Sequence, residues 1–191
     1  AKAGCASVMI EDQLAPKRCG HTPGKAVVSR NEACDRIRAA VDERAALREQ
    51  GRDILILART DARHEHGLGE AIDRATAFAE LGADILFVEA PKSEAEMRTV
   101  CASLPGPKMA NIVEGGETPA LPNAALRDIG YSIAAYPLSL MASAMQAMVT
   151  TLRSMREDAR PDQMDFAELR RRIGFEAYYE TSEAYSSAKR E

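Results

Sequence analysis

The residues best suited to chemistry gather near the start of the chain. Cys19 follows Lys17 and Arg18 and is followed by Gly20 and His21. Neighbouring positive charge stabilises a thiolate, so this pattern predicts a lowered pKa for the Cys19 thiol. A thiol that titrates near neutral pH can both give and take a proton, which indicates a general acid or base. A buried structural cysteine is the alternative, and the charged surroundings argue against it.

Two carboxylates, Glu11 and Asp12, come just before this segment and end an apolar run over 8–10. A carboxylate at the carboxyl end of a strand, followed by a loop with a proton donor, is typical of α/β-barrel active sites. Asp12 has a structural alternative, as do Lys17 and Arg18, which taken singly fit a solvated surface pair. A thiol hydrolase with Cys19 as nucleophile and His21 as base is also open, although two residues this close in a tight loop are poorly placed to pair.

Five strand-then-helix units must position these residues. The strands are short apolar runs bounded by turn residues, as buried parallel strands are, and cover 7–12, 54–60, 84–90, 108–114 and 131–137. Ser29 with Glu32 forms a capping box at the start of the first helix, and Gly82 ends the second. Alternating strands and helices predict a parallel sheet with right-handed crossovers.

The first eleven residues repeat the pattern of residues 79–89, with a helix end, a glycine, a strand and a carboxylate. We therefore expect Ala1 to lie in the last turn of a helix. Because eight units close a barrel, about three units would precede the five that are visible. Three helices are expected after the last strand, over 138–158, 165–173 and 175–185, which divides the chain into a barrel part, 1–158, and a helical extension, 159–191. The methionines of 138–158 suit adaptable core packing.

The other strand ends carry polar residues. Arg59 ends the second strand, and its fork suits two-pronged capture of a carboxylate, with Asp61 to hold it; a purely structural Arg–Asp pair is the alternative. Glu89 and Asn111 end the next two strands and should meet the same rim. A buried Glu89 needs a partner, and His21 is one candidate.

Composition excludes several classes of protein. The 191 residues are 46% hydrophobic, enough for one domain with a core, and carry a net charge of −4, without the basic stripe of a nucleic-acid-binding protein. No apolar run approaches the roughly 20 residues of a membrane span. The four cysteines are irregularly spaced, so we expect no disulfide framework and a reducing cytoplasm. His64 and His66 flank Glu65 and suggest a zinc site only weakly, because they fall in a polar loop before Gly67 and are interpreted as surface residues.

Six segments in order resemble the isocitrate lyase / phosphoenolpyruvate mutase superfamily, in its 2-methylisocitrate lyase, dimethylmalate lyase and oxaloacetate hydrolase-like branch. They are Glu11-Asp12-Gln13, Lys17-Arg18-Cys19-Gly20-His21, Ala58-Arg59-Thr60-Asp61-Ala62, Val88-Glu89-Ala90, Ala110-Asn111-Ile112-Val113-Glu114-Gly115-Gly116 and Tyr136-Pro137-Leu138-Ser139. The resemblance covers essentially the whole chain. It implies a (β/α)8 TIM-like barrel of the phosphoenolpyruvate mutase type, of which about the last five units are present, plus C-terminal helices.

The resemblance also implies an activity and a set of site residues. The activity is Mg²⁺-dependent (Mn²⁺ is an alternative) cleavage or hydrolysis of a carbon–carbon bond in a small 2-hydroxy or 2-oxo di- or tricarboxylate, such as methylisocitrate, dimethylmalate or oxaloacetate. Glu11 would bind the metal through water, and its main ligands would lie before residue 1. The implied catalytic residues are Cys19, Lys17, Arg18, His21 and Glu89, and the implied substrate-binding residues are Gly20, Arg59, Asn111, Glu114, Pro137 and Ser139.

The implied partners are a carboxylate substrate and further copies of the chain, with a late helix exchanged between subunits. Two other functions stay open. One is a catalytically incomplete barrel fragment with a structural or oligomerising role. The other is a phosphonomutase-type activity, which the loop Lys17-Arg18-Cys19-Gly20-His21 disfavours because it is of the lyase type.

Overall fold

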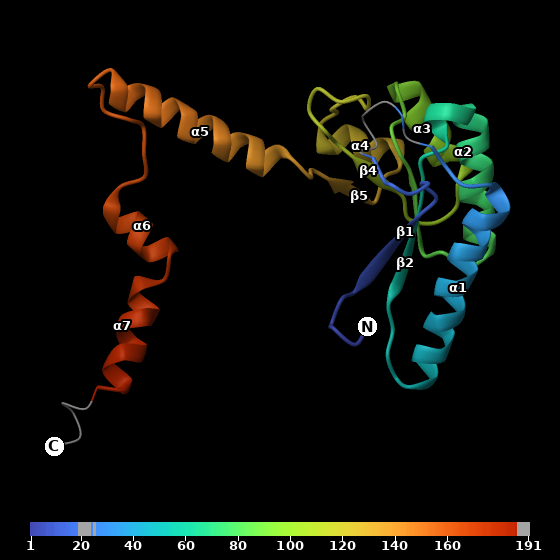
Figure 1. Ribbon diagram of the computed structural model, residues 1–191, viewed down its shortest axis with the longest axis horizontal. Helices are drawn as coiled ribbons and strands as arrows, with labels where there is room; N and C mark the ends of the chain where they lie inside the picture. Colours follow the sequence, from blue (N-terminus) through green and yellow to red (C-terminus); the bar gives the residue numbers. More distant parts are fainter. Residues whose placement is uncertain (19–23, 25, 187–191) are drawn as a thin grey trace. The chain divides into compact units, whose positions relative to one another are not determined.

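The computed structural model describes residues 1–18, 24 and 26–186 (Figure 1). Contacts within the chain divide it into two units, Ala1–Leu140 and Met141–Glu191, and each unit is described by itself. This division does not test the domain boundary expected at residue 158, which stays a prediction. No described helix is both long enough and apolar enough to cross a membrane.

The first unit contains five parallel strands, as the sequence predicts. Three form one sheet in chain order: β1 (Ser7–Glu11), β2 (Leu55–Thr60) and β3 (Ile85–Val88). The other two pair with each other: β4 (Met109–Asn111) and β5 (Ile133–Ala135). A parallel bridge between Leu86 and Lys108, with the Leu86 N–H donating to the Pro107 carbonyl at 3.0 Å, connects β3 to β4. The carboxyl ends of neighbouring strands therefore share one edge, where polar strand-end residues can meet.

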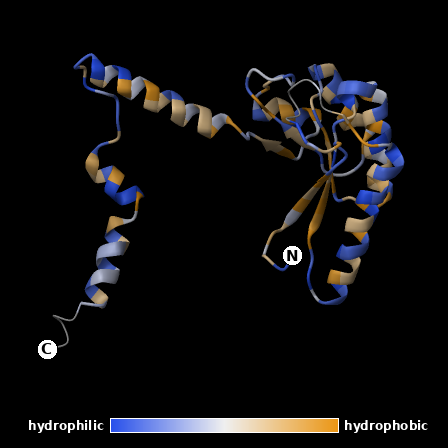
Figure 2. Cartoon of the chain, in the orientation of Figure 1, coloured by the Kyte–Doolittle hydropathy of each residue, from blue (hydrophilic) through white to orange (hydrophobic). Residues whose placement is uncertain are grey.

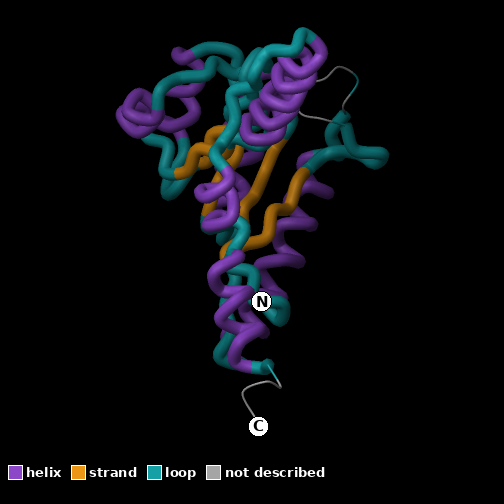
Figure 3. Tube along the Cα trace, turned by 90° about the vertical axis from the view of Figure 1, so that its left-hand side faces the viewer, coloured by secondary structure: helices purple, strands orange, loops and turns teal. Residues whose placement is uncertain are grey.

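Each of the first four strands leads into a helix: α1 (Arg30–Glu49), α2 (Arg63–Glu80), α3 (Glu94–Ser103) and α4 (Asn123–Ile129) (Figure 1). Figure 3 shows helices beside the strands. Ser29 caps α1 as predicted, because its hydroxyl accepts from the Glu32 N–H at 3.2 Å. The Glu32 carboxylate accepts from Arg36 instead of from the Ser29 N–H, so of the predicted capping box the described hydrogen bonds show the Ser29 half alone. Gly82 ends α2 with a φ of +102°, which a residue with a side chain rarely adopts. The helix boundaries thus agree with the sequence wherever a cap or a glycine marks them.

The two faces of the sheet pack differently because side chains alternate along a strand. The helix-facing residues, among them Ala58, Leu86 and Val88, join the Ile37 and Phe78 side chains of α1 and α2 in the main core. The opposite face holds a smaller apolar cluster of Leu57, Ile85, Phe87 and Met109, with Ala135 beside it. The strands are among the most hydrophobic parts of this unit (Figure 2). The polar strand ends lie on the second of these faces.

One local prediction is wrong. His64 and His66 do not lie in a loop, because α2 begins at Arg63 and includes both; Gly67 interrupts it with a φ of +85°. The glycine gives the sequence the look of a loop, although helical geometry resumes after it. His64 is also half-buried, not a surface residue. Residues 2–3 form a turn in which the Gly4 N–H donates to the Ala1 carbonyl at 3.0 Å, the same bond that the Gly82 N–H makes to the Ala79 carbonyl at 2.9 Å at the end of α2, so the expected helix end at Ala1 stays a prediction.

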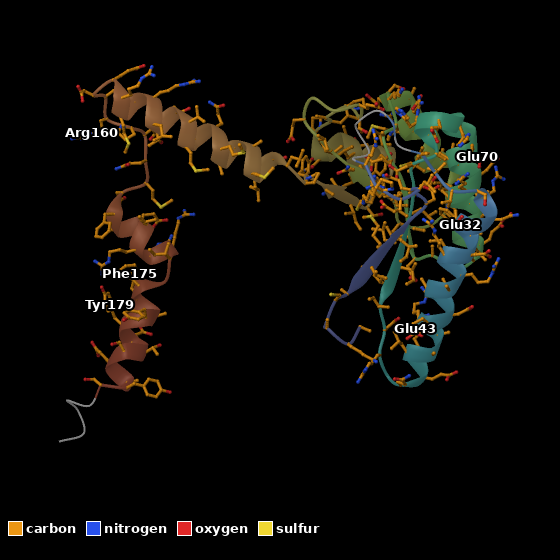
Figure 4. All side chains as sticks on the ribbon, in the orientation of Figure 1. Glu32, Glu43, Glu70, Arg160, Phe175 and Tyr179 are labelled. Atoms are coloured by element: carbon orange, nitrogen blue, oxygen red, sulfur yellow. The ribbon has the colours of Figure 1, made fainter. Side chains whose placement is uncertain are left out.

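The second unit is helical. It holds most of α5 (Ser139–Arg156), followed by α6 (Phe166–Arg172) and α7 (Phe175–Ala184), close to the predicted ranges. The Arg170 guanidinium lies 5.6–6.0 Å from the ring centres of Phe166, Phe175 and Tyr179, so it joins α6 to α7. Phe175 and Tyr179 also make an edge-to-face contact at 5.8 Å (Figure 4). None of the described residues of these three helices is buried.

An ion-pair network between α1 and α2 gives a testable pH dependence. Glu70, which is labelled in Figure 4, accepts hydrogen bonds from Arg30 and, at 2.8 Å, from Arg74. The Arg30 hydrogen bond is the main cause that lowers the pKa of Glu70 from 4.5 to about 2. Because this pKa is lower in the folded than in the unfolded chain, the stabilisation is complete above pH 4.5 and is lost as the pH falls toward 2.

We therefore expect Glu70→Gln to lower the free energy of unfolding by about 1 kcal/mol at neutral pH, the upper end for partly exposed pairs. The difference from wild type should shrink as the pH falls from 4.5 toward 2, measured by urea unfolding at several pH values. Glu43→Gln, at an exposed position of α1, is the matched control. A Glu70→Gln difference that does not change with pH would contradict this assignment.

Candidate active site

Four polar side chains meet at the carboxyl edge of the strands. Glu11 pairs with Arg59 in the β1–β2 register, and Arg59 pairs with Phe87 in the β2–β3 register. Side chains two residues apart on a strand share a face, so Glu89 follows Phe87 on the same face, and Asn111 ends β4. The predicted meeting of Glu89 and Asn111 at one rim is therefore confirmed, and the roles predicted for these residues stay predictions.

Arg59 is the centre of this group. Its Nε and Nη2 atoms donate to the two carboxylate oxygens of Asp61 at 2.7 and 2.9 Å. Its guanidinium also lies 3.3 Å from Glu89, 3.5 Å from Glu11 and 5.1 Å from the centre of the Phe87 ring. Burial alone would lower the pKa of Arg59, but the Asp61 hydrogen bonds and the three carboxylates hold it above its usual value. The fork is thus rigidly held and permanently charged, which is what recognition of a carboxylate requires.

Glu89 is buried at 1% exposure and has partners. Besides Arg59, the Asn111 side-chain amide donates to it at 3.2 Å. The predicted partner, His21, lies outside the described residues. Asn111, expected to donate to substrate, donates to Glu89 in this structure, which orients its amide at the rim.

The lysine of the Cys19 segment reaches the same group. Lys17 Nζ lies 2.8 Å from a Glu11 carboxylate oxygen. The Arg18 backbone N–H donates to the Gln13 side-chain oxygen at 3.0 Å. Cys19, Gly20 and His21 lie outside the described residues, so their predicted roles stay predictions. The segment that leads to Cys19 nevertheless contacts the four side chains described above (Glu11, Arg59, Glu89 and Asn111, the Arg59 cluster) through Lys17.

Asp12 anchors the site from behind. Its carboxylate is 1% exposed and accepts from the Thr60 hydroxyl at 2.6 Å, the Asp61 N–H at 2.8 Å and Arg74 Nη1 at 3.1 Å. Burial raises the pKa of Asp12, while these three donors oppose the rise. The structural interpretation of Asp12 agrees with this geometry.

Sequence reasoning missed Arg74 and Gln13. Arg74 lies on the buried face of α2 with Ala71, Ala75 and Phe78, and a charged residue among such neighbours is the signal that could have revealed it. Gln13 stands in the sequence as part of the Glu11-Asp12-Gln13 motif, with no further signal of its contacts. Both connect the strand ends to the surrounding helices and loops.

The far side of the rim is formed by the segments after β4 and β5. The Ser139 hydroxyl donates to the Glu114 carboxylate at 2.6 Å, and this bond lowers the pKa of Glu114. Glu114 and Pro137 are exposed, and Ser139 is half-buried. The structure thus brings Glu114 and Ser139 together as a hydrogen-bonded pair. The hydrogen bonds described above do not include one between this pair and Arg59.

Glu11 alone does not make a metal site. Within residues 1–18, 24 and 26–186, no group of three or more His, Cys, Asp or Glu side chains is arranged to hold a metal ion. Glu11 offers the hard oxygen that Mg²⁺ prefers, but its carboxylate already faces Lys17 and Arg59. The described residues therefore do not fit a complete magnesium site.

The sequence and the fold both match known proteins. Residues 1–156 match the family model described as phosphoenolpyruvate phosphomutase. The chain is 40% identical to 2,3-dimethylmalate lyase of Eubacterium barkeri over 98% of its own length and 65% of that protein, and 47% identical to 2-methylisocitrate lyase of Escherichia coli (strain K12) over 72% and 45%. Among solved structures, it matches oxaloacetate acetylhydrolase in complex with the inhibitor 3,3-difluorooxalacetate, with a TM-score of 0.84, 34% identity and coverage of 96% of this chain and 62% of that chain.

The chain thus spans less than two thirds of the length of the relatives that it matches. The family match, in contrast, covers most of the chain and includes every strand that contributes a residue to the Arg59 cluster. The resemblance inferred from the motifs is confirmed: this chain, with its parallel strand-and-helix units, belongs to the phosphoenolpyruvate phosphomutase family.

Proposed function

We propose that the protein cleaves or hydrolyses a carbon–carbon bond in a small 2-hydroxy or 2-oxo di- or tricarboxylate. The observation that carries the proposal is the Arg59 guanidinium, fixed by Asp61 at the rim of a parallel sheet. The relatives support the reaction class, because their names specify a dimethylmalate lyase, a methylisocitrate lyase and an oxaloacetate acetylhydrolase.

Arg59 would bind one carboxylate of the substrate. Asp61 holds the edge of the guanidinium formed by Nε and Nη2. Nη2 also lies 3.3 Å from the Glu89 carboxylate. A substrate carboxylate would bind the guanidinium beside Glu89, and Asn111 would donate to a neighbouring substrate oxygen from its place beside Glu89.

Cys19 would handle the proton on carbon. When the carbon–carbon bond breaks, its electron pair remains on the carbon next to the substrate carboxylate, and a thiol there can deliver the proton that this carbon needs. Lys17 would balance the negative charge of Glu11 at the entrance to the Cys19 segment. The described residues do not form a complete Mg²⁺ site, so the reaction is assigned to this chain's own side chains, and we propose only that Glu11 contacts the metal ion through water.

The experiment is a paired measurement on the protein. Dimethylmalate, 2-methylisocitrate and oxaloacetate are each incubated with it and Mg²⁺, and the products are followed by proton NMR. Mg²⁺ binding is measured separately by calorimetry. Cleavage of one acid that depends on Mg²⁺ supports the proposal. Mg²⁺ binding without cleavage of any of the three would refute the substrate class, and neither binding nor cleavage would favour a catalytically incomplete protein.

Arg59→Lys tests the two-pronged contact. Lysine keeps the charge but offers no fork, so we expect kcat/KM to fall about 10- to 100-fold, the effect of one lost hydrogen bond to a charged group. Arg63→Lys is the matched control, because Arg63 also makes a fork, to Glu96, but outside the Arg59 cluster. An unchanged kcat/KM in Arg59→Lys would make Arg59 purely structural.

We also propose that the protein is a homo-oligomer in which α5 contacts a neighbouring subunit. Large apolar side chains on α5 and α6 are exposed, including Leu140 at 86%, Phe166 at 71% and Leu152 at 66%. Apolar surface of this extent is typical of protein interfaces. We expect light scattering to give a mass above the 20.7 kDa of one chain, and Leu152→Glu to lower it. A monodisperse monomer would contradict this proposal.

The cysteines support a reducing compartment. Of the residues that the structure describes, Cys5, Cys34 and Cys101 are free thiols. Free thiols persist where glutathione and thioredoxin act, so we propose the cytoplasm as the site of action. Cell fractionation with an antibody to the protein tests this directly.

A further inference from the structure

Gln13 lies between two parts of the site: Asp61, which follows β2, and Arg18, in the segment that follows β1. Its side-chain Nε2 donates to Asp61 Oδ1 at 3.0 Å, and its Oε1 accepts from the Arg18 backbone N–H at 3.0 Å. The residue is 5% exposed. A carboxylate can only accept and a backbone N–H can only donate, so one orientation of the amide satisfies both partners. Glutamine is therefore used here as a two-sided connector.

The backbone of Gln13 is fixed independently of its side chain. Arg36, on α1, donates to the Gln13 carbonyl at 3.0 Å and to the Glu11 carbonyl at 3.1 Å. Gln13 also forms an antiparallel bridge with Val27, closed by the hydrogen bond from the Leu14 N–H to the Ala26 carbonyl at 2.8 Å. Changing the side chain should therefore leave the course of the backbone at residue 13 intact.

The connection continues to the arginine at the centre of the site. Asp61 Oδ1 accepts both from Gln13, at 3.0 Å, and from Arg59 Nη2, at 2.9 Å. A continuous line of hydrogen bonds thus runs from Arg59 through Asp61 and Gln13 to the Arg18 amide. In the sequence, the next residue after Arg18 is Cys19.

We propose that Gln13 is a positioning residue that couples the geometry of the Arg59–Asp61 pair to the backbone at Arg18. A shift of the Arg59 guanidinium moves the shared oxygen of Asp61, and Gln13 passes this movement to the Arg18 amide. The proposal rests on the proposed function only for the role of Arg59 in binding a carboxylate. It deepens that function, because it makes the approach to Cys19 depend on the carboxylate-binding arginine.

The first test measures hydrogen exchange of the Arg18 amide by NMR in the full chain without ligand. Gln13→Met keeps the volume of the side chain but removes both hydrogen bonds, so exchange at Arg18 should accelerate about 5-fold, the equivalent of one hydrogen bond. Gln13→Glu keeps an acceptor for the Arg18 N–H but sets a carboxylate against Asp61 Oδ1, so exchange at Arg18 should fall between that of Gln13→Met and that of wild type. Gln50→Met, at an exposed glutamine after α1, is the matched control.

The second test asks whether Arg59 reaches Arg18 through Gln13. Arg59→Lys should accelerate exchange at Arg18 in the wild-type background and have no effect in the Gln13→Met background, a non-additive result that a local structural role of Gln13 would not produce. Additive effects, or exchange in Gln13→Met within about 2-fold of wild type, would overturn the proposal. Circular dichroism melting confirms that each variant is folded. Because neither readout needs turnover, failure of the proposed activity would leave this result unaffected.

Discussion

Replacing Cys19 by serine is expected to reduce the turnover number of the active protein by about 10²- to 10⁴-fold, the usual range for loss of a general acid or base. Serine has nearly the shape of cysteine, but its hydroxyl does not titrate near neutral pH, so it cannot carry the proton in both directions. Binding of the substrate should change little, because Arg59 and Asn111 are untouched. The expected signature is therefore a fall in kcat with a nearly constant KM, measured by steady-state kinetics.

Cys5→Ser provides the control for this experiment. Cys5 is a free, exposed thiol before β1. Cys5→Ser therefore makes the same chemical replacement at a position outside the Arg59 cluster. It should keep wild-type kcat and KM. If Cys19→Ser kept more than about a tenth of wild-type turnover, Cys19 would be removed from the mechanism and another group would have to move the proton.

Much of the fold could be predicted because its signals are local. Buried parallel strands appear as short apolar runs, and helix ends are marked by residues with a direct physical role, such as Ser29 at the start of α1 and Gly82 after α2. The prediction was wrong where a local signal has two meanings. In the sequence Gly67 indicates the end of a loop before a helix, but the helix that begins at Arg63 continues past it with a local interruption.

The candidate site was predictable to the extent that strand order fixes it. Parallel strands place their carboxyl ends at one edge, so Glu11, Arg59, Glu89 and Asn111 could be grouped without coordinates. The partners could not, because which atoms pair depends on side-chain packing between distant segments. The structure gives Glu89 the partners Arg59 and Asn111, which the sequence did not indicate, while the candidate His21 lies outside the described residues and stays a prediction.

The hydrogen bonds between Asp12 and Arg74, behind the candidate site, show why such pairing matters for stability. Arg74 is a buried cation that donates to Asp12, to the Val28 carbonyl and to Glu70 at 3.1, 2.8 and 2.8 Å. These bonds join α2 to the end of β1 and to the segment that leads into α1. An intact buried ion pair contributes little net stability, but removal of one partner leaves a charge without compensation.

We therefore expect Arg74→Met to lower the free energy of unfolding by about 3–5 kcal/mol at neutral pH, measured by urea unfolding. Methionine fills similar space, so the loss reports the uncompensated Asp12 carboxylate and not a cavity. Arg38→Met is the matched control, because Arg38 forms only an exposed pair with Asp35 on α1 and should cost less than about 1 kcal/mol.

The dependence on pH identifies the cause of this loss. Burial already raises the pKa of Asp12 above 3.8, and Arg74 is one of the groups that oppose the rise. Without Arg74 the pKa of Asp12 rises further, so at low pH the carboxyl is protonated in the folded chain and no longer needs a cation. Since the folded state then binds more protons than the unfolded one, its stability relative to wild type should improve as the pH falls. The double variant Asp12→Asn/Arg74→Met should likewise recover part of the loss at neutral pH. A deficit that stayed constant with pH, and that Asp12→Asn did not reduce, would show that Arg74 stabilises the fold through packing alone.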